Sequence, residues 1–92
     1  MPEEEEWQGH PAINYQGRRP LYLQVADLID ERVRRGELAV DSKLPSERDL
    51  RDLYRVAYST IRRAMEELRE RGTVETVHGR GTYVVKTPPP KE

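Results

Sequence analysis

The sequence predicts a mainly α-helical fold with one small β-hairpin, in which three helices precede a two-stranded wing. Two observations predict this order. Apolar residues recur with helical spacing in three segments between residues 20 and 72, and two β-prone runs flank a glycine-rich tip between residues 74 and 85. A chain of 92 residues can form one such domain around a thin core.

The first segment, residues 1–19, shows no apolar periodicity and combines four consecutive glutamates with scattered glycine and proline. Such a composition is typical of disordered chain. We therefore expect a mostly disordered acidic arm, from which Trp7 and Ile13 are able to dock on the domain surface.

The first helix is expected to begin at Pro20, since proline suits the first turn of a helix, and to end near Gly36. Apolar residues at helical spacing line one face of this segment: Tyr22, Val25, Ala26, Ile29 and Val33.

The second helix is short. Ser46 can cap its start, with Asp49 in the place that a capping box gives to glutamate. We expect Leu50 and Leu53 to face inward and the helix to stop around Tyr54.

The third helix follows a turn at Arg55 and Val56, and Gly72 stands where a C-terminal cap belongs. Its apolar side is predicted to consist of Ala57, Ile61, Ala64, Met65 and Leu68. Two helices joined by so short a turn are typical of a helix-turn-helix.

The hairpin completes the fold. Val74–Val77 and Thr82–Val85 are the expected strands, with His78–Gly81 as the tip. Residues 20–86 are thus predicted to form a winged helix-turn-helix domain, and residues 87–92 a proline-rich tail or linker.

The composition excludes several classes of protein. Without cysteine there is no disulfide framework, thiolate zinc site or thiol nucleophile, and a reducing, cytoplasmic location is expected. The acidic N-terminus is unlike a secretory signal, and no segment approaches the length that spans a membrane. With two histidines and no phosphate-binding glycine loop, we expect neither an enzyme nor a cofactor or metal site.

Positive charge is concentrated in the second half of the chain. Residues 43–86 contain ten Lys and Arg against seven Asp and Glu, whereas residues 1–42 carry a net charge of −4. A basic face of this size suits contact with phosphates, although ordinary helix surfaces reach similar values.

The start of the third helix carries the candidate recognition residues. Its outer face and sides are predicted to present Tyr58, Ser59, Arg62 and Arg63. Its later half carries carboxylates that phosphate would repel: Glu66, Glu67 and Glu70. Only the first half is therefore expected to enter a DNA groove. Arg62 or Arg63 can pair with guanine, while Tyr58, Ser59 and Thr60 suit phosphate oxygens or a thymine methyl.

Two further positions are candidates for contacts with DNA. Arg48, in the first turn of the second helix, is placed to hold a phosphate, and its alternative is an exposed ion pair with Asp52. At the hairpin tip, Arg80 stands between two glycines and suits insertion into a narrow minor groove, although a tight turn alone would also require the glycines. His78 suits a phosphate or groove contact, or is a plain surface histidine.

Three blocks carry a resemblance to a known family: Leu44-Pro45-Ser46-Glu47-Arg48-Asp49-Leu50, Ser59-Thr60-Ile61-Arg62-Arg63-Ala64-Met65 and His78-Gly79-Arg80-Gly81-Thr82-Tyr83-Val84. Together with Pro20-Leu21-Tyr22, they resemble the GntR family of bacterial regulators over residues 20–85.

The resemblance implies a homodimer on palindromic double-stranded operator DNA. It places Arg48 on the backbone or a guanine, and His78 and Gly79 in the minor groove. It places four residues of the third helix near bases and phosphates: Tyr58, Ser59, Thr60 and Arg62. Members of the family normally continue into a C-terminal domain that binds a metabolite, so a small-molecule effector is expected only if such a domain follows.

The chain departs from the family pattern around the turn. Arg55 stands where glycine is usual, which forces a non-glycine residue to positive φ. Ala57 stands where Ser or Thr usually caps the third helix, and Tyr58 replaces a frequent arginine.

Taken together, these features predict a sequence-specific DNA-binding transcriptional regulator that acts as a repressor. The alternative is a winged helix that docks another protein. Adjacent Arg62 and Arg63 favour DNA, because a protein-docking face would favour exposed aromatic and leucine side chains.

Overall fold

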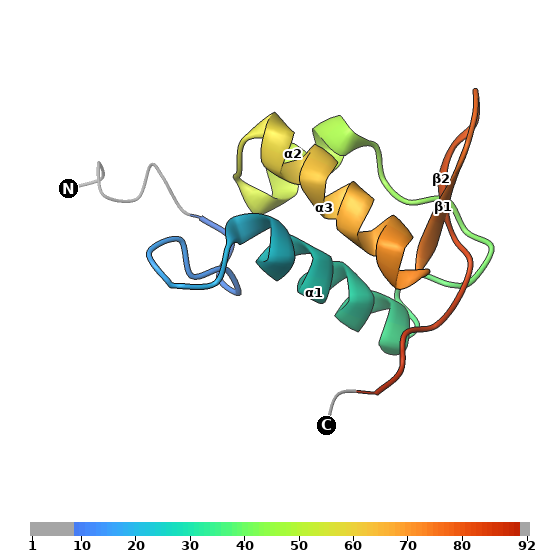
Figure 1. Ribbon diagram of the computed structural model, residues 1–92, viewed down its shortest axis with the longest axis horizontal. Helices are drawn as coiled ribbons and strands as arrows, with labels where there is room; N and C mark the ends of the chain where they lie inside the picture. The colour runs from blue at the N-terminus through green and yellow to red at the C-terminus, as the bar shows by residue number, and fades with distance from the viewer. Residues whose placement is uncertain (1–8, 91–92) are drawn as a thin grey trace.

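The computed structural model describes residues 9–90. Three helices precede two strands: α1 (Leu21–Arg34), α2 (Glu47–Tyr54), α3 (Tyr58–Arg71), β1 (Val74–Val77) and β2 (Gly81–Val84). In Figure 1, α1 and α3 lie side by side, α2 lies above them, and the hairpin stands at the far end of α3. The fold class predicted from the sequence is confirmed.

The core lies where the three helices meet the base of the hairpin. Its innermost side chains are no more than 4% exposed: Val25, Ala26, Ile29, Val33, Leu44, Leu50, Tyr54, Ile61, Ala64, Met65, Leu68, Val74 and Val84. Burial of each large apolar side chain stabilises the fold by about 1.5 to 3 kcal/mol. The helical spacing read from the sequence for α1 and α3 therefore identifies most of the core.

The helix ends follow local chemistry. The Asp49 amide donates to Ser46 Oγ at 3.0 Å, which confirms the predicted cap of α2. Gly72 ends α3 in the left-handed conformation with φ 84°, also as predicted. Pro20 is the residue just before α1 rather than part of its first turn.

The prediction that Leu53 faces inward is wrong, because Leu53 is 45% exposed while Tyr54 is 1% exposed. α2 has eight residues, so it offers the core one narrow face. Leu50 and Tyr54 are four residues apart and share that face, so the tyrosine ring takes the inward position.

The hairpin is antiparallel, with Val74 opposite Val84 and Val77 opposite Gly81. The second strand thus begins one residue earlier than predicted. Lys43 forms an isolated bridge with Tyr83, so the loop before α2 runs along the outer edge of β2.

Part of residues 9–19, which the sequence places in a mostly disordered arm, packs against the domain, and the predicted docking of Ile13 is confirmed. Ile13 is 7% exposed, and the Tyr15 hydroxyl donates to the backbone carbonyl of Tyr54. The His10 and Tyr54 rings lie 5.0 Å apart. This packing is absent from the sequence pattern because it depends on the end of α2, far along the chain. Trp7 lies outside the described residues.

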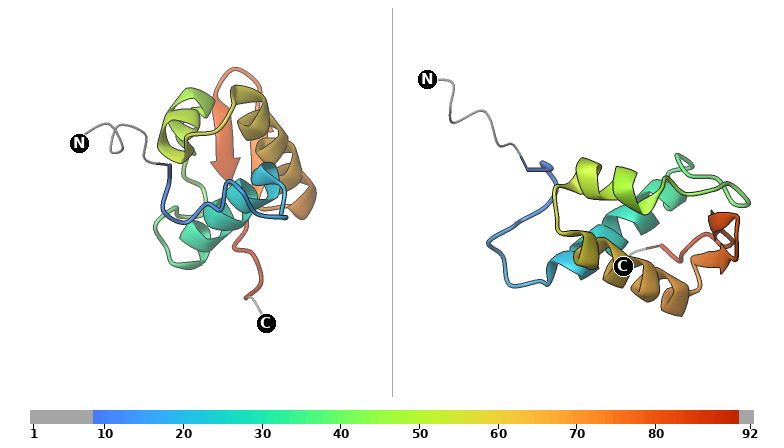
Figure 2. Two further views of the ribbon diagram at one scale, coloured as in Figure 1. Left: turned by 90° about the vertical axis from the view of Figure 1, so that its left-hand side faces the viewer. Right: turned by 90° about the horizontal axis from the view of Figure 1, so that it is seen from above.

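The C-terminal segment also packs on the domain. Pro88 is buried, and Arg34 Nε donates to the Pro89 carbonyl at 2.8 Å. The chain leaves at the lower edge of Figure 1, whereas the hairpin tip lies at the upper edge. The left view of Figure 2 likewise shows the C-terminal segment below the domain and the hairpin tip above it.

Candidate nucleic-acid interface

The turn between α2 and α3 sets the direction of α3. Arg55 adopts the left-handed conformation, with φ 58° and ψ 51°, and its amide donates to the Arg51 carbonyl at 2.8 Å. A non-glycine residue in this conformation costs about 1 to 2 kcal/mol. Ala57 precedes α3 and provides no side-chain cap. The departure at Arg55 thus gives a strained backbone, and the departure at Ala57 leaves the start of α3 without a side-chain cap.

The first turns of α3 divide into an inner and an outer face. Ile61 is fully buried, whereas Tyr58, Ser59 and Arg62 are exposed and Thr60 is half-buried. The buried positions anchor the helix, so the outer side chains are presented from a rigid support.

Arg62 and Arg63 point to different neighbours. Arg62 Cζ lies 5.9 Å from the centroid of the Tyr58 ring, toward the beginning of α3. Arg63 Cζ lies 4.3 Å from the centroid of the Tyr22 ring, which belongs to α1. The structure therefore separates two arginines that the sequence leaves equivalent.

The end of α3 is fixed by a network of charges around Arg71. Its guanidinium contacts Glu67 at 2.9 Å, Asp30 at 2.9 Å and Asp27 at 3.1 Å. Asp30 is buried and also accepts from Thr73 Oγ1 at 2.8 Å. Burial alone lowers the pKa of Arg71, but the hydrogen bonds to these carboxylates outweigh it and raise the pKa above its ordinary value. The network ties α3 and the start of β1 to α1.

The first three residues of the hairpin tip, His78, Gly79 and Arg80, are exposed, and Gly81 is half-buried. Gly79 has φ 79°, and a Cβ there would meet nothing within 4 Å, so its backbone conformation alone requires glycine. His78 and Arg80 are both exposed at the tip. The left view of Figure 2 shows the tip, α2 and the α2–α3 turn on the same side of the molecule.

Arg48 is exposed in the first turn of α2 and does not pair with Asp52. Instead, Arg51 contacts Asp52 at 3.1 Å. The alternative reading of Arg48 as one half of an ion pair is therefore wrong, and its charge is not neutralised within the described residues.

A division of the cations emerges from these contacts. Within residues 9–90, arginines paired with carboxylates lie mainly on α1 and its flanks: Arg19, Arg32, Arg34, Arg35, Arg51 and Arg71. Among the same residues, the cations without a carboxylate within 4.0 Å include two at the flanks of the domain, Arg18 and Lys86. The others lie on α2, α3, the loops beside α2 and the hairpin: Lys43, Arg48, Arg55, Arg62, Arg63, Arg69 and Arg80. Lys43 is absent from the sequence-based set, although it directly precedes the Leu-Pro-Ser-Glu-Arg block.

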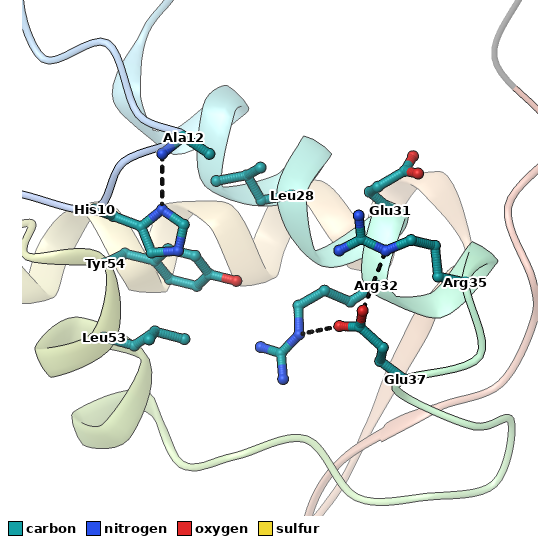
Figure 3. A pocket seen from close by; sticks show the side chains of 9 residues that line it. All are labelled: His10, Ala12, Leu28, Glu31, Arg32, Arg35, Glu37, Leu53 and Tyr54. Carbon is teal, nitrogen blue, oxygen red and sulfur yellow. Dashed lines mark hydrogen bonds and ion pairs between the residues drawn. The ribbon is translucent and has the colours of Figure 1, made fainter.

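An open cleft of about 400 Å³ lies away from the hairpin, between the arm, α1 and α2. Figure 3 shows Arg32 and Arg35 both turned toward Glu37, at 3.5 and 3.2 Å. Leu28 and the exposed Leu53 supply its apolar walls. Arg32 and Arg35 are thus paired within the cleft, unlike Arg48, Arg62 and Arg80, which contact no carboxylate in the described part of the chain.

None of the helices in residues 9–90 combines the length and apolar character that crossing a bilayer requires. Nor does this part of the chain bring three His, Cys, Asp or Glu side chains together in a group that could hold a metal ion.

Three helices, the three-residue turn and the hairpin define a winged helix-turn-helix domain. The family model described as "Bacterial regulatory proteins, gntR family" matches residues 21–84. The chain therefore belongs to the gntR family of bacterial regulatory proteins.

Individual relatives agree with this assignment. The chain is 43% identical over 68 residues to the mannosyl-D-glycerate transport/metabolism system repressor MngR of Escherichia coli K12, covering 74% of this chain and 28% of that protein. It is 40% identical over 72 residues to the HTH-type transcriptional regulator YhcF of Bacillus subtilis 168, covering 78% and 60%. It thus spans less than two thirds of the length of either relative.

A solved structure shares the fold at similar size. The DNA-binding domain of AraR, crystallised in complex with its operator ORX1, superposes with a TM-score of 0.73 at 31% identity. The alignment covers 85% of this chain and 100% of that domain.

Proposed function

We propose that this chain is the sequence-specific DNA-binding part of a transcriptional regulator and reads one half of a palindromic operator. One observation carries the proposal. Arg48, Arg62 and Arg80 stand on three separate elements, all are exposed, and none has a carboxylate partner within residues 9–90. Cations distributed in this way can contact two grooves and the intervening backbone of one duplex.

α3 is the proposed recognition helix, with its first half in the major groove. Arg62 pairs with a guanine, which is worth about 1 to 3 kcal/mol of discrimination. Tyr58, Ser59 and Thr60 contact phosphates or a thymine methyl. Arg63, which lies over the Tyr22 ring of α1, approaches the DNA backbone at the edge of the major groove.

The remaining contacts come from α2 and the hairpin. Arg48 holds a backbone phosphate and so adds affinity without sequence preference. His78, Gly79 and Arg80 enter the minor groove, where positive φ at the glycine lets the backbone approach closely. AraR, which shares this fold, was crystallised with operator DNA.

The chain is proposed to act as a cytoplasmic homodimer that represses by blocking transcription initiation, without enzymatic activity. Two matched relatives, MngR and NagR, are named repressors. Residues 20–86 are the proposed DNA-binding unit, and a small-molecule effector would act through a further domain.

Selection of binding sites from random duplex DNA tests this proposal. We expect a palindromic consensus, and affinity that falls steeply with salt, by about 0.9 log unit per log unit of salt for each phosphate contacted. A protein-docking winged helix would give no consensus and a shallow salt dependence. If no duplex competes better than bulk polyanion, the proposal fails.

A further inference from the structure

A second cleft, of about 310 Å³, lies between the tip end of the hairpin and the start of α2. Lys43, Glu47, Arg80 and Gly81 are among the residues that line it. The cleft therefore joins two elements of the proposed interface and contains a cation, Lys43, that the proposed function does not use.

The backbone of Lys43 is held in place by the hairpin. Lys43 bridges Tyr83, and the next residue, Leu44, donates its amide to the Thr82 carbonyl at 2.8 Å. The position of Lys43 relative to the hairpin is therefore set by strand pairing and not by a loose loop.

The side chain of Lys43 runs across Gly81. A Cβ at Gly81 would lie 2.6 Å from Lys43 Cε and 3.4 Å from Nζ, closer than the lysine stem allows in its present path. Gly81 also has φ 131°. Glycine at this position thus permits both the turn into β2 and the passage of the lysine toward the tip.

The charge of Lys43 is available to an external anion. Lys43 is exposed and has no carboxylate within 4.0 Å among residues 9–90. Glu47 faces the same cleft from α2 but forms no ion pair with it. A lysine ammonium is a compact charge on a flexible stem and suits a single phosphate oxygen.

We propose that Lys43 binds a DNA backbone phosphate in this cleft, beside the groove that Arg80 enters. The ligand is a phosphodiester, and the contact carries no sequence preference. This inference rests on the proposed DNA-binding function. It adds a residue from outside the helix-turn-helix and the tip, and it gives Gly81 a role in leading that residue to the backbone.

The test compares the full chain with Lys43→Gln, Lys43→Arg and a matched control, Lys86→Gln. The control removes the same charge from Lys86, which lies beside Gly72 at the other end of α3. Binding is measured by fluorescence anisotropy over a salt series, on the selected operator duplex and on a scrambled duplex. Thermal unfolding of each variant checks that the fold is retained.

We expect Lys43→Gln to weaken both duplexes alike, by about eightfold at 0.1 M salt, and to reduce the salt slope by about 0.9. Lys43→Arg should restore the slope, and Lys86→Gln should change neither quantity. Glu47→Gln should strengthen binding to both duplexes, because it removes the carboxylate that faces the phosphate.

The two proposals fail in different ways. If the wild-type chain binds the operator but Lys43→Gln behaves like Lys86→Gln, the Lys43 contact is overturned and the DNA-binding function stands. If the wild-type chain shows no salt-dependent binding to any duplex, both are overturned. A loss confined to the operator would also overturn the phosphate assignment, since a backbone contact cannot distinguish sequences.

Discussion

The two ends of α3 use the same kind of side chain for opposite purposes. At its end, Arg71 is surrounded by Asp27, Asp30 and Glu67, and its charge is neutralised within the fold. At its start, Arg62 lies over the Tyr58 ring, pairs with no carboxylate of residues 9–90 and remains exposed. The neighbours from α1, and not the arginine itself, decide which one is structural and which one faces a ligand.

This difference explains how a short helix can present a charge accurately. The carboxylates of α1 fix the far end of α3, while buried Ile61 and Met65 fix its inner face. Across the residues that the structure describes, the start of α3 is thus held in place without an ion pair that DNA would have to displace. Pre-positioned contacts of this kind lose less entropy when they bind.

The largest expected effect comes from releasing the fixed end. Arg71→Ala should lower the free energy of unfolding by about 3 kcal/mol, because it leaves the buried Asp30 carboxylate without its cation. Arg69→Ala is the matched control, since the Arg69 guanidinium donates to Thr76 Oγ1 at 3.0 Å and contacts no carboxylate within residues 9–90. Urea denaturation measures both, and equal losses in the two variants would contradict the anchoring role.

The next effect comes from the free end. Arg62→Ala should weaken operator binding by about 1 to 3 kcal/mol and relax one base position, with stability nearly unchanged. Arg48→Ala should instead weaken all duplexes alike. Competition binding on single-base operator variants tests the difference, and unchanged affinity of Arg62→Ala for every duplex would remove the base-reading role.

A smaller change in stability is expected from a cap at the start of α3. Ala57→Ser supplies the missing N-terminal cap and should raise the free energy of unfolding by about 1 kcal/mol. Ser46→Ala, which removes the cap that α2 already has, should lower it by a similar amount. Denaturation curves that leave Ala57→Ser no more stable than wild type would show that another group already satisfies those amides.

The smallest effect separates the two neighbouring arginines. Arg63→Ala should cost about 0.5 kcal/mol of stability, the value of an exposed contact between a cation and an aromatic ring. Its base preference in site selection should match that of the wild type. A changed consensus for Arg63→Ala, with none for Arg62→Ala, would reverse the assignment of the base-reading residue.

Sequence periodicity was sufficient to predict the fold because α1 and α3 are stabilised mainly by the packing of one apolar face of each helix. The cap at Ser46 and the positive φ of Arg55 could also be predicted from the sequence, since both depend on residues only a few positions away. Local chemistry thus predicts the elements, their ends and the exposed arginines.

Contacts between distant residues account for the differences. Leu53 and Tyr54 compete for one inward position on α2, and the shape of the core decides between them. The separation of Arg62 from Arg63 depends on Tyr22, which lies about forty residues earlier in the chain. Lys43 reaches the interface only because the hairpin pairs with the loop before α2. None of these relations has a periodic or short-range signature.

The segments that pack on either side of the three helices and the hairpin determine where the boundaries of the folded unit lie. The family match spans residues 21–84, yet Ile13 fills part of the core and Pro88 is buried beyond the last strand. A version trimmed to the matched stretch would open the carbonyl of Tyr54 to solvent and uncover one end of α1. Exchanges of DNA-binding domains between relatives should therefore place their junctions outside residues 9–90, so that the folded unit is transferred whole.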